Sequence, residues 1–355
     1  MSFTYGVIEG LYDDKHQWSW AARHAYVEFC QQNGQQFYIY APKNDPFLRE
    51  RWREPWPDDE LNQLKSLADA FRSAGIAFGI GFTPYQLESL DKQSRQCLRE
   101  KLALINGVNP SILCILFDDF SCKIPHLAET QSEVVHFMAG LSKAEHFMTV
   151  GTWYSSDPLL ERVYGAMPEN YQEDLGRSLD PGVDIFWTGN HVISSGYDES
   201  GLSEIAQKLR RKPFLWDNYP VNDPKWLQDR LRLYALTGRP WKLEQWTHGH
   251  AVNPMIQPWL SMIPLATLNY LYQRKEDYQP HQAFKQALKT LCSQQLAKAI
   301  DDELVTFSQE GNQNLSDFTR NRLTYKFMPL MKETDEPFVK EILSWIHPDK
   351  NSSLS

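Results

Sequence analysis

Residues 112–119 read Ile112-Leu113-Cys114-Ile115-Leu116-Phe117-Asp118-Asp119, an apolar run that ends in two carboxylates. An uninterrupted run of this kind, flanked by polar sequence, is typical of a strand buried on both faces of a parallel sheet. Such sheets place their chemistry at the carboxyl ends of the strands, where the two aspartates stand. Neighbouring carboxylates oppose each other's ionisation, so we expect one raised pKa, as a general acid needs near neutral pH. The pair also fits a helix cap or a magnesium ligand.

Short apolar runs alternate with helical patterns from the start of the chain to about residue 270. We predict strands at Tyr5–Glu9, Phe37–Ala41, Ala77–Gly81, Ile112–Phe117, Phe147–Gly151, Asp184–Trp187, Pro213–Trp216 and, more weakly marked, Lys242–Trp246. We predict helices at Trp18–Gln32, Asp59–Ala74, Ser94–Ile105, Gln131–Leu141, Tyr171–Leu179, Ser203–Arg211, Lys225–Thr237 and Trp259–Tyr272.

Eight strand–helix units favour a (β/α)8 barrel of the TIM type, with a site built from the loops that follow the strands. A doubly wound sheet of six or seven strands is the alternative. The sequence after the first strand has no glycine-rich phosphate loop, which that alternative commonly carries. We therefore expect the barrel.

The sequence after residue 280 is helical and rich in Gln, Lys and Glu, without strand signals. Amphipathic patterns predict helices at Ala283–Leu304, Leu315–Met331 and Phe338–Ile346. The expected organisation is a catalytic barrel at residues 1–280, a small helical subdomain at 281–347 and a flexible tail at 348–355.

Composition narrows the class of ligand and the compartment. The net charge of −9 argues against nucleic-acid binding, which needs a basic surface. The chain shows no apolar run long enough to span a membrane and no secretory leader at its start. Its five cysteines lack CxxC spacing, so neither a disulfide framework nor a zinc site is indicated. We expect a cytoplasmic protein that needs no metal or cofactor.

Polar residues follow the other predicted strands as well. These strand ends are Gly6-Val7-Ile8-Glu9-Gly10, Tyr40-Ala41-Pro42-Lys43-Asn44-Asp45-Pro46, Gly151-Thr152-Trp153-Tyr154, Trp187-Thr188-Gly189, Trp216-Asp217-Asn218 with Asn222-Asp223, and Val252-Asn253-Pro254. Amide, carboxylate, ammonium and phenol groups beside tryptophan suit a neutral, hydroxyl-rich ligand. Any one of these segments alone is also compatible with an ordinary turn or helix cap.

Together with Phe117-Asp118-Asp119, these segments resemble, in order and spacing, the family 84 glycoside hydrolases over residues 4–272. That family contains β-N-acetylglucosaminidases, including protein O-GlcNAcases. The resemblance implies a (β/α)8 barrel and retaining hydrolysis of terminal N-acetylglucosamine, in which the substrate acetamide is the nucleophile. It implies neither a metal nor a cofactor, and a carbohydrate or glycoprotein as the partner.

The resemblance also implies roles for matching residues. Asp118 would orient the acetamide and Asp119 would be the general acid and base. The implied substrate-binding residues are Gly10, Lys43, Tyr154, Trp216, Asn218, Asp223 and Asn253. Among them, Trp216 would form an apolar wall around the acetamide methyl and Asp223 would bind the sugar hydroxyls at positions 4 and 6.

Residues 11–18 depart from the family pattern, because this loop is longer and more acidic. Since it borders the implied sugar pocket, we expect it to affect substrate range. Three alternatives stay open at this point: an endo-acting, hyaluronidase-like enzyme, a sugar-binding module without turnover, and a magnesium-dependent phosphatase. The absence of a phosphate-binding glycine loop disfavours the phosphatase.

The segment His248-Gly249-His250 offers two histidines that could bind a metal. No third ligand stands at a fitting local spacing. We therefore expect these histidines to make hydrogen bonds within a loop.

Overall fold

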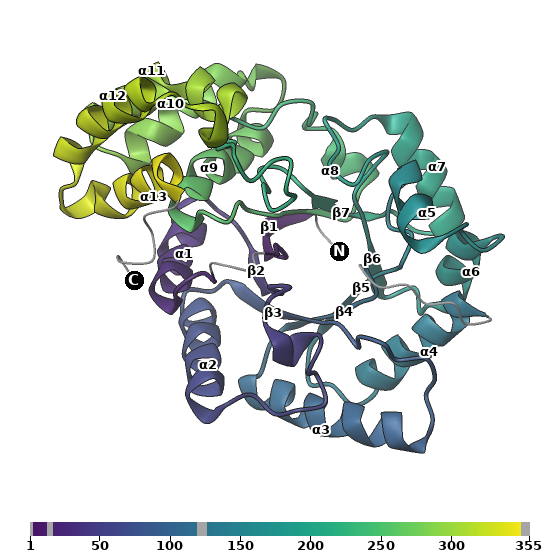
Figure 1. The fold of residues 1–355 in the computed structure, drawn as a ribbon. Coiled ribbons are helices and arrows are strands. Elements are labelled where there is room, and N and C mark those ends of the chain that lie inside the picture. Colours follow the sequence, from purple (N-terminus) through teal and green to yellow (C-terminus); the bar gives the residue numbers. More distant parts are fainter. Residues whose placement is uncertain (1–2, 13–16, 119–125, 349–355) are drawn as a thin grey trace. The chain divides into compact units, whose positions relative to one another are not determined.

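The computed structural model describes residues 3–12, 17–118 and 126–348. Within these residues, eight parallel strands follow one another around a closed barrel, in which β1 pairs with both β2 and β8. The strands are β1 (Thr4–Glu9), β2 (Phe37–Tyr40), β3 (Ala77–Phe82), β4 (Ile112–Leu116), β5 (His146–Val150), β6 (Val183–Trp187), β7 (Phe214–Asp217) and β8 (Gly249–Val252). Figure 1 shows them as a ring with helices on its outside. The predicted (β/α)8 barrel is confirmed.

Helices connect the strands, as the alternating pattern predicts. They are α1 (Trp20–Gln32), α2 (Asp58–Ser73), α3 (Lys92–Val108), α4 (Leu127–Ala139), α5 (Pro158–Tyr164), α6 (Tyr171–Ser178), α7 (Glu199–Leu209) and α8 (Leu243–Trp246). In α2 the buried residues are Leu64, Leu67, Ala68 and Phe71, the spacing of one helix face. The short helix α5 was not predicted; Asp157 caps its first turn by accepting a hydrogen bond from the Leu159 amide at 2.9 Å.

The apolar run before the two aspartates forms β4, and all five residues of this strand are buried. It pairs with β3 on one side and β5 on the other. One further backbone hydrogen bond follows the strand, from Phe117 N to Val150 O at 2.9 Å. Asp118 therefore comes directly after the last ordered ladder contact, at the carboxyl end of the strand.

The eighth strand lies later in the chain than predicted. Residues Leu243–Trp246 form α8, and the strand that closes the barrel is Gly249–Val252. This strand has only four residues and includes a glycine and a histidine, so it lacks the apolar run on which the prediction relied. It is fully buried because β7 and β1 flank it. His250 is accordingly a strand residue, and its predicted place in a loop was wrong.

The chain divides into two compact units, Met1–Asn218 with Gly238–Asn253, and Tyr219–Thr237 with Pro254–Ser355. The first unit contains the whole barrel. The second contains α9 (Pro258–Arg274), α10 (Pro280–Leu291), α11 (Gln294–Asp302), α12 (Asp317–Phe327) and α13 (Glu336–Ile346). The domain boundary expected at residue 280 stays a prediction, and residues 349–355 of the expected tail lie outside the described residues.

Two helix predictions in the second unit were wrong, because one helix is absent and the other is divided in two. The expected helix Lys225–Thr237 is absent from the described backbone, where residues 225–229 form turns and residues 230–237 form neither a helix nor a strand. Its buried apolar residues are Leu227, Leu231, Leu233, Ala235 and Leu236, which do not fall on one face of a helix. The expected helix Ala283–Leu304 is broken into α10 and α11, where Ser293 caps α11 by accepting from the Leu296 amide.

One carboxylate in the second unit makes stability depend on pH. Glu341 on α13 accepts hydrogen bonds from the Trp259 and Leu260 amides, at 3.0 and 2.8 Å, at the start of α9. Burial raises the pKa of Glu341 to about 8, although the two backbone hydrogen bonds act to lower it. A raised carboxyl pKa disfavours the folded state once the unfolded chain ionises. Stability from this residue should therefore fall as the pH rises from about 4.5 to about 8.

We expect Glu341→Gln to remove much of that pH dependence. The measurement is the free energy of unfolding at about pH 5.5 and about pH 8.5, where the wild-type difference should exceed that of the variant by about 1 kcal/mol or more. Glu336→Gln on the same helix is the matched control, because its carboxylate pairs with Lys340 at the surface. Equal pH dependence in wild type and Glu341→Gln would contradict this prediction.

Candidate active site

Asp118 is the predicted catalytic residue that the structure describes. It is buried at the carboxyl end of β4, and its Oδ2 forms an ion pair with Nζ of Lys43, which follows β2. Lys43 is also buried, and its backbone N–H donates to the Leu11 carbonyl at 3.0 Å. A buried carboxylate next to a buried ammonium is the first feature of a polar site at this rim of the barrel.

Trp216 brings an apolar surface to the same place. The Lys43 ammonium lies 5.7 Å from the centroid of the Trp216 ring, within the range of a cation–π contact. Trp216 is nearly fully buried at the third position of β7. The Lys43 ammonium thus contacts both the Asp118 carboxylate and the Trp216 ring. Three predicted site residues, which lie in β7 or directly after β2 and β4, therefore come together.

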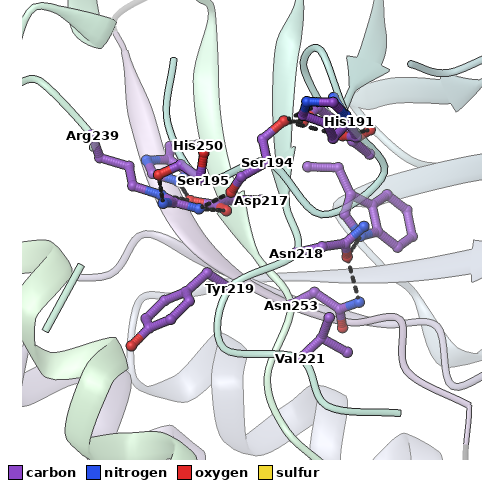
Figure 2. A network of polar contacts seen from close by, with 12 residues as sticks. His191, Ser194, Ser195, Asp217, Asn218, Tyr219, Val221, Arg239, His250 and Asn253 are labelled. Atoms are coloured by element: carbon purple, nitrogen blue, oxygen red, sulfur yellow. Dashed lines mark hydrogen bonds and ion pairs between the residues drawn. The ribbon is translucent and has the colours of Figure 1, made fainter. Parts of the chain in front are cut away.

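A chain of hydrogen bonds joins the other amides of the site. Gly10 N donates to Asn253 Oδ1 at 3.1 Å, and Asn253 Nδ2 donates to Asn218 Oδ1 at 2.9 Å. The same Asn218 oxygen accepts from Trp216 Nε1 at 3.1 Å, while Asn218 Nδ2 donates to the Val192 carbonyl at 2.8 Å. Figure 2 shows the Asn218–Asn253 contact. These contacts link the ends of β1, β7 and β8 and fix which way the Asn218 amide points.

Gly10 has no side chain for a steric reason. A Cβ atom at this position would lie 2.2 Å from Cζ2 of Trp216, far inside van der Waals contact. Any other residue would displace the indole or the backbone of the β1 loop. The close approach explains why a glycine stands in this part of the predicted sugar pocket.

For the remaining predicted residues, the structure gives backbone contacts of Tyr154 and Asp223 and does not describe Asp119. Tyr154 is buried after β5, and its carbonyl accepts from the Thr188 amide at 3.0 Å, which joins the loops after β5 and β6. Asp223 belongs to the second unit, where its carbonyl accepts from Gln228 Nε2 at 2.6 Å. Asp119 lies outside the described residues, as do residues 13–16 of the unusual loop. The roles assigned to Tyr154, Asp223 and Asp119 stay predictions.

A buried ring of hydrogen bonds, which the sequence did not predict, contacts the backbone directly after β4. Tyr171 OH accepts from the Thr152 amide at 2.8 Å and donates to Gln131 Oε1 at 2.5 Å. Gln131 Nε2 donates to Thr152 Oγ1 at 2.9 Å, and that hydroxyl donates to the Phe117 carbonyl at 3.2 Å. The ring thus holds the backbone of the residue before Asp118. Nothing local in the sequence marks it, since its members come from α4, α6 and the loop after β5.

We expect Tyr171→Phe to destabilise the chain by about 1–3 kcal/mol, because it leaves the buried Thr152 amide and the Gln131 carbonyl without their partner. The measurement is the free energy of unfolding in denaturant. Tyr325→Phe is the control, because the Tyr325 side chain is exposed and its change should lie within about 0.5 kcal/mol of wild type. Equal stabilities of the two variants would contradict the importance of the ring.

The structure offers two further observations on ligands and membranes. Over the described residues, no three or more His, Cys, Asp or Glu side chains are grouped as a metal site would require. In the same part of the chain, no helix combines the length and the apolar character needed to cross a membrane. Independence from metals stays a prediction.

The fold and the rim residues define a (β/α)8 barrel with a buried site of carboxylate, ammonium, amide and indole groups at the carboxyl ends of its strands, where barrel enzymes hold their active sites. The sequence model of the beta-N-acetylglucosaminidase family matches residues 5–309. The chain belongs to this family.

Proteins similar to this chain include two mammalian enzymes and one bacterial protein of solved structure. Protein O-GlcNAcase of Mus musculus is 26% identical over 284 residues, and that of Rattus norvegicus is 26% identical over 285 residues. Each alignment covers 76% of this chain but only 30% of the relative, so the chain spans less than a third of their length. The solved structure of a mutant O-GlcNAc hydrolase from Thermobaculum terrenum superposes with a TM-score of 0.79 at 27% identity, over 98% of this chain and 81% of the other.

Proposed function

We propose that this chain is a retaining exo-β-N-acetylglucosaminidase that removes terminal N-acetylglucosamine from glycoconjugates, O-GlcNAc on proteins included. The observation that carries the proposal is the buried Asp118–Lys43 ion pair beside Trp216, at the carboxyl end of β4. Membership of the beta-N-acetylglucosaminidase family supports it.

In the first step, the carbonyl oxygen of the substrate acetamide attacks the anomeric carbon as the glycosidic bond breaks. The leaving oxygen takes a proton from Asp119. Asp118 accepts a hydrogen bond from the acetamide N–H, which holds the carbonyl oxygen in line and stabilises the positive charge that develops on the amide. The product of this step is a bicyclic oxazoline in its protonated, oxazolinium form, with its N–H still hydrogen-bonded to Asp118. Because the nucleophile belongs to the substrate, the carboxylate separation expected of other retaining glycosidases does not apply.

In the second step, water attacks the anomeric carbon and gives a proton to Asp119. The oxazoline ring opens, the acetamide is restored and the sugar leaves with its original configuration. The Lys43 ammonium forms an ion pair with Asp118. A cation so placed favours the carboxylate form that accepts from the acetamide N–H.

The other residues would bind the sugar. Trp216 would offer an apolar wall for the acetamide methyl, and Asn218, whose Oδ1 accepts from Trp216 and Asn253, would contact the acetamide. Tyr154 would donate to the acetamide oxygen region, and Asp223 would bind the hydroxyls at positions 4 and 6. Recognition of those far hydroxyls requires a chain end, which favours exo over endo action.

The test is release of nitrophenol from p-nitrophenyl N-acetyl-β-glucosaminide, with the N-acetylgalactosaminide as the specificity control. Turnover of the first in clear excess over the second supports the proposal. Binding without turnover would instead identify a sugar-binding module. Depolymerisation of hyaluronan with no release of nitrophenol would identify the endo-acting alternative.

We expect this activity to survive excess chelator, because each step above uses only side chains and the substrate acetamide. The measurement is the rate before and after treatment with EDTA. An activity lost on chelation and restored by magnesium or zinc would contradict the prediction.

A cytoplasmic location is a further part of the proposal. It is supported by the cysteines, because the four among the described residues, Cys30, Cys97, Cys114 and Cys292, are free thiols. Fractionation of cells that express the chain tests it.

A further inference from the structure

A buried charged cluster of Asp217, Arg239 and His250 lies next to Asn218 of the site. Asp217, the last residue of β7, is fully buried and accepts from Arg239 through both oxygens, at 2.6 and 2.8 Å. His250 Nε2 on β8 lies 3.0 Å from the same carboxylate and is also fully buried. Figure 2 shows Asp217 close to Arg239 and His250. The proposed mechanism uses none of these three side chains.

The cluster keeps Asp217 ionised. Burial acts to raise the pKa of Asp217, but the charge and hydrogen bonds of Arg239, together with the hydrogen bond to His250, outweigh it and hold the pKa well below its usual range. A carboxylate with no exposed surface cannot touch a substrate. Its contribution must therefore act through neighbouring residues.

Asp217 reaches the site through two routes. Successive strand residues point to opposite faces, so Asp217 faces the cluster while Trp216 and Asn218 face each other on the other side. Arg239 extends the contact to the loop after β6, where it donates to the Ser194 and Ser195 carbonyls, each at 2.8 Å. The same loop supplies the Val192 carbonyl that accepts from Asn218 Nδ2. Asp217 thus fixes both the strand end that carries Asn218 and the loop that orients its amide.

We infer that Asp217, clamped by Arg239 and His250, is a positioning residue that sets the orientation of the Asn218 amide for the substrate acetamide. This inference rests on the proposed function. Asn at position 217 could not replace the carboxylate, because its amide cannot accept from both donors of Arg239 and from His250. It would also leave the buried guanidinium without a counter-charge.

The test is a double-mutant cycle in which kcat/KM for the aryl N-acetylglucosaminide is measured for Asp217→Asn, Asn218→Ala and the double variant. We expect Asp217→Asn to lower kcat/KM by about 10- to 100-fold, since a small misplacement of a positioning group has effects of this size. The double variant should lose no more than Asn218→Ala alone, because residue 217 acts through residue 218. Additive losses would overturn the inference.

Two further measurements separate positioning from loss of stability. A thiazoline that mimics the oxazoline should bind Asp217→Asn more weakly by the same factor as the loss in kcat/KM, while the dependence on leaving group stays that of wild type. Glu303→Gln is the matched control, because Glu303 is a buried carboxylate paired with Arg322 and Lys326 in the second unit. It should lose stability and keep the wild-type thiazoline affinity. Unchanged thiazoline affinity in Asp217→Asn would contradict the inference.

Conservative variants keep the test decisive if Asp217→Asn does not fold. Arg239→Lys keeps the charge but loses the two-point contact, and it then takes the place of Asp217→Asn in the cycle. His250→Gln keeps an N–H donor and should lose less activity than His250→Leu. A wild type without hydrolysis would contradict the proposed function, and the inference with it, whereas an active wild type with additive losses would contradict the inference alone.

Discussion

The Asp118→Asn variant is expected to hydrolyse N-acetylglucosaminides about 10²- to 10³-fold more slowly than wild type, the usual effect of losing one transition-state hydrogen bond. The carboxylate is buried beside Lys43 and would accept from the acetamide N–H, whose charge grows as the oxazoline forms. An Asn at this position keeps the shape but presents a neutral group. The measurement is kcat/KM for the aryl glycoside.

Progressive fluorination of the N-acetyl group shows what Asp118 does. Electron withdrawal makes the carbonyl oxygen a poorer nucleophile, so the wild-type rate should fall steeply with each fluorine. The Asp118→Asn variant should show a different slope, because it no longer polarises the amide. If Asp118 served only to tune Asp119, its replacement would shift the pH profile and leave the fluorine dependence intact.

The control for this experiment is Asp198→Asn, because Asp198 caps α7 through the Gly201 amide and lies outside the proposed chemistry. It should keep the wild-type fluorine slope. Wild-type rates that are indifferent to fluorination, combined with no inhibition by the thiazoline, would assign Asp118 to some other reaction.

Most of the barrel was predictable, because the first seven strands are short and largely apolar and lie between polar, helical stretches. The matches are close: β4 was expected at Ile112–Phe117 and lies at Ile112–Leu116. The eighth strand was misplaced because its burial comes from β7 and β1 and not from its own composition. The segment at 225–237 was mistaken for a helix because its buried positions depend on distant partners, such as the Phe307 carbonyl that accepts from Leu231 N.

The site was predictable where its residues stand at strand ends within short motifs. Gly10 and Asn253 are an example, since both were predicted and they meet across 243 positions of sequence. The supporting residues were not predictable, because a lone Arg239 or Gln131 carries no local signal. His250 was expected to make hydrogen bonds within a loop, since the sequence does not show that it lies in β8 against Asp217.

Asp119→Asn should have the other large effect, and its size should depend on the leaving group. For an alkyl or protein-linked N-acetylglucosaminide, we expect a loss of about 10²- to 10⁴-fold, the range that general acid catalysis supplies. An acidic phenol departs with little need of a proton, so the loss on a dinitrophenyl glycoside should be much smaller. The measurement is a plot of log kcat/KM against leaving-group pKa, which should be shallow for wild type and steep for the variant.

The Asp118 and Asp119 variants should differ in both their leaving-group dependence and their fluorine dependence. Each variant therefore serves as the control for the other. Asp118→Asn should keep the shallow wild-type plot against leaving-group pKa, because its defect lies in the nucleophile. Asp119→Asn should keep the steep fluorine dependence, because the acetamide still attacks. Equal losses of Asp119→Asn on good and poor leaving groups would remove Asp119 from the acid role. The proton would then have to come from another group at the rim of the barrel.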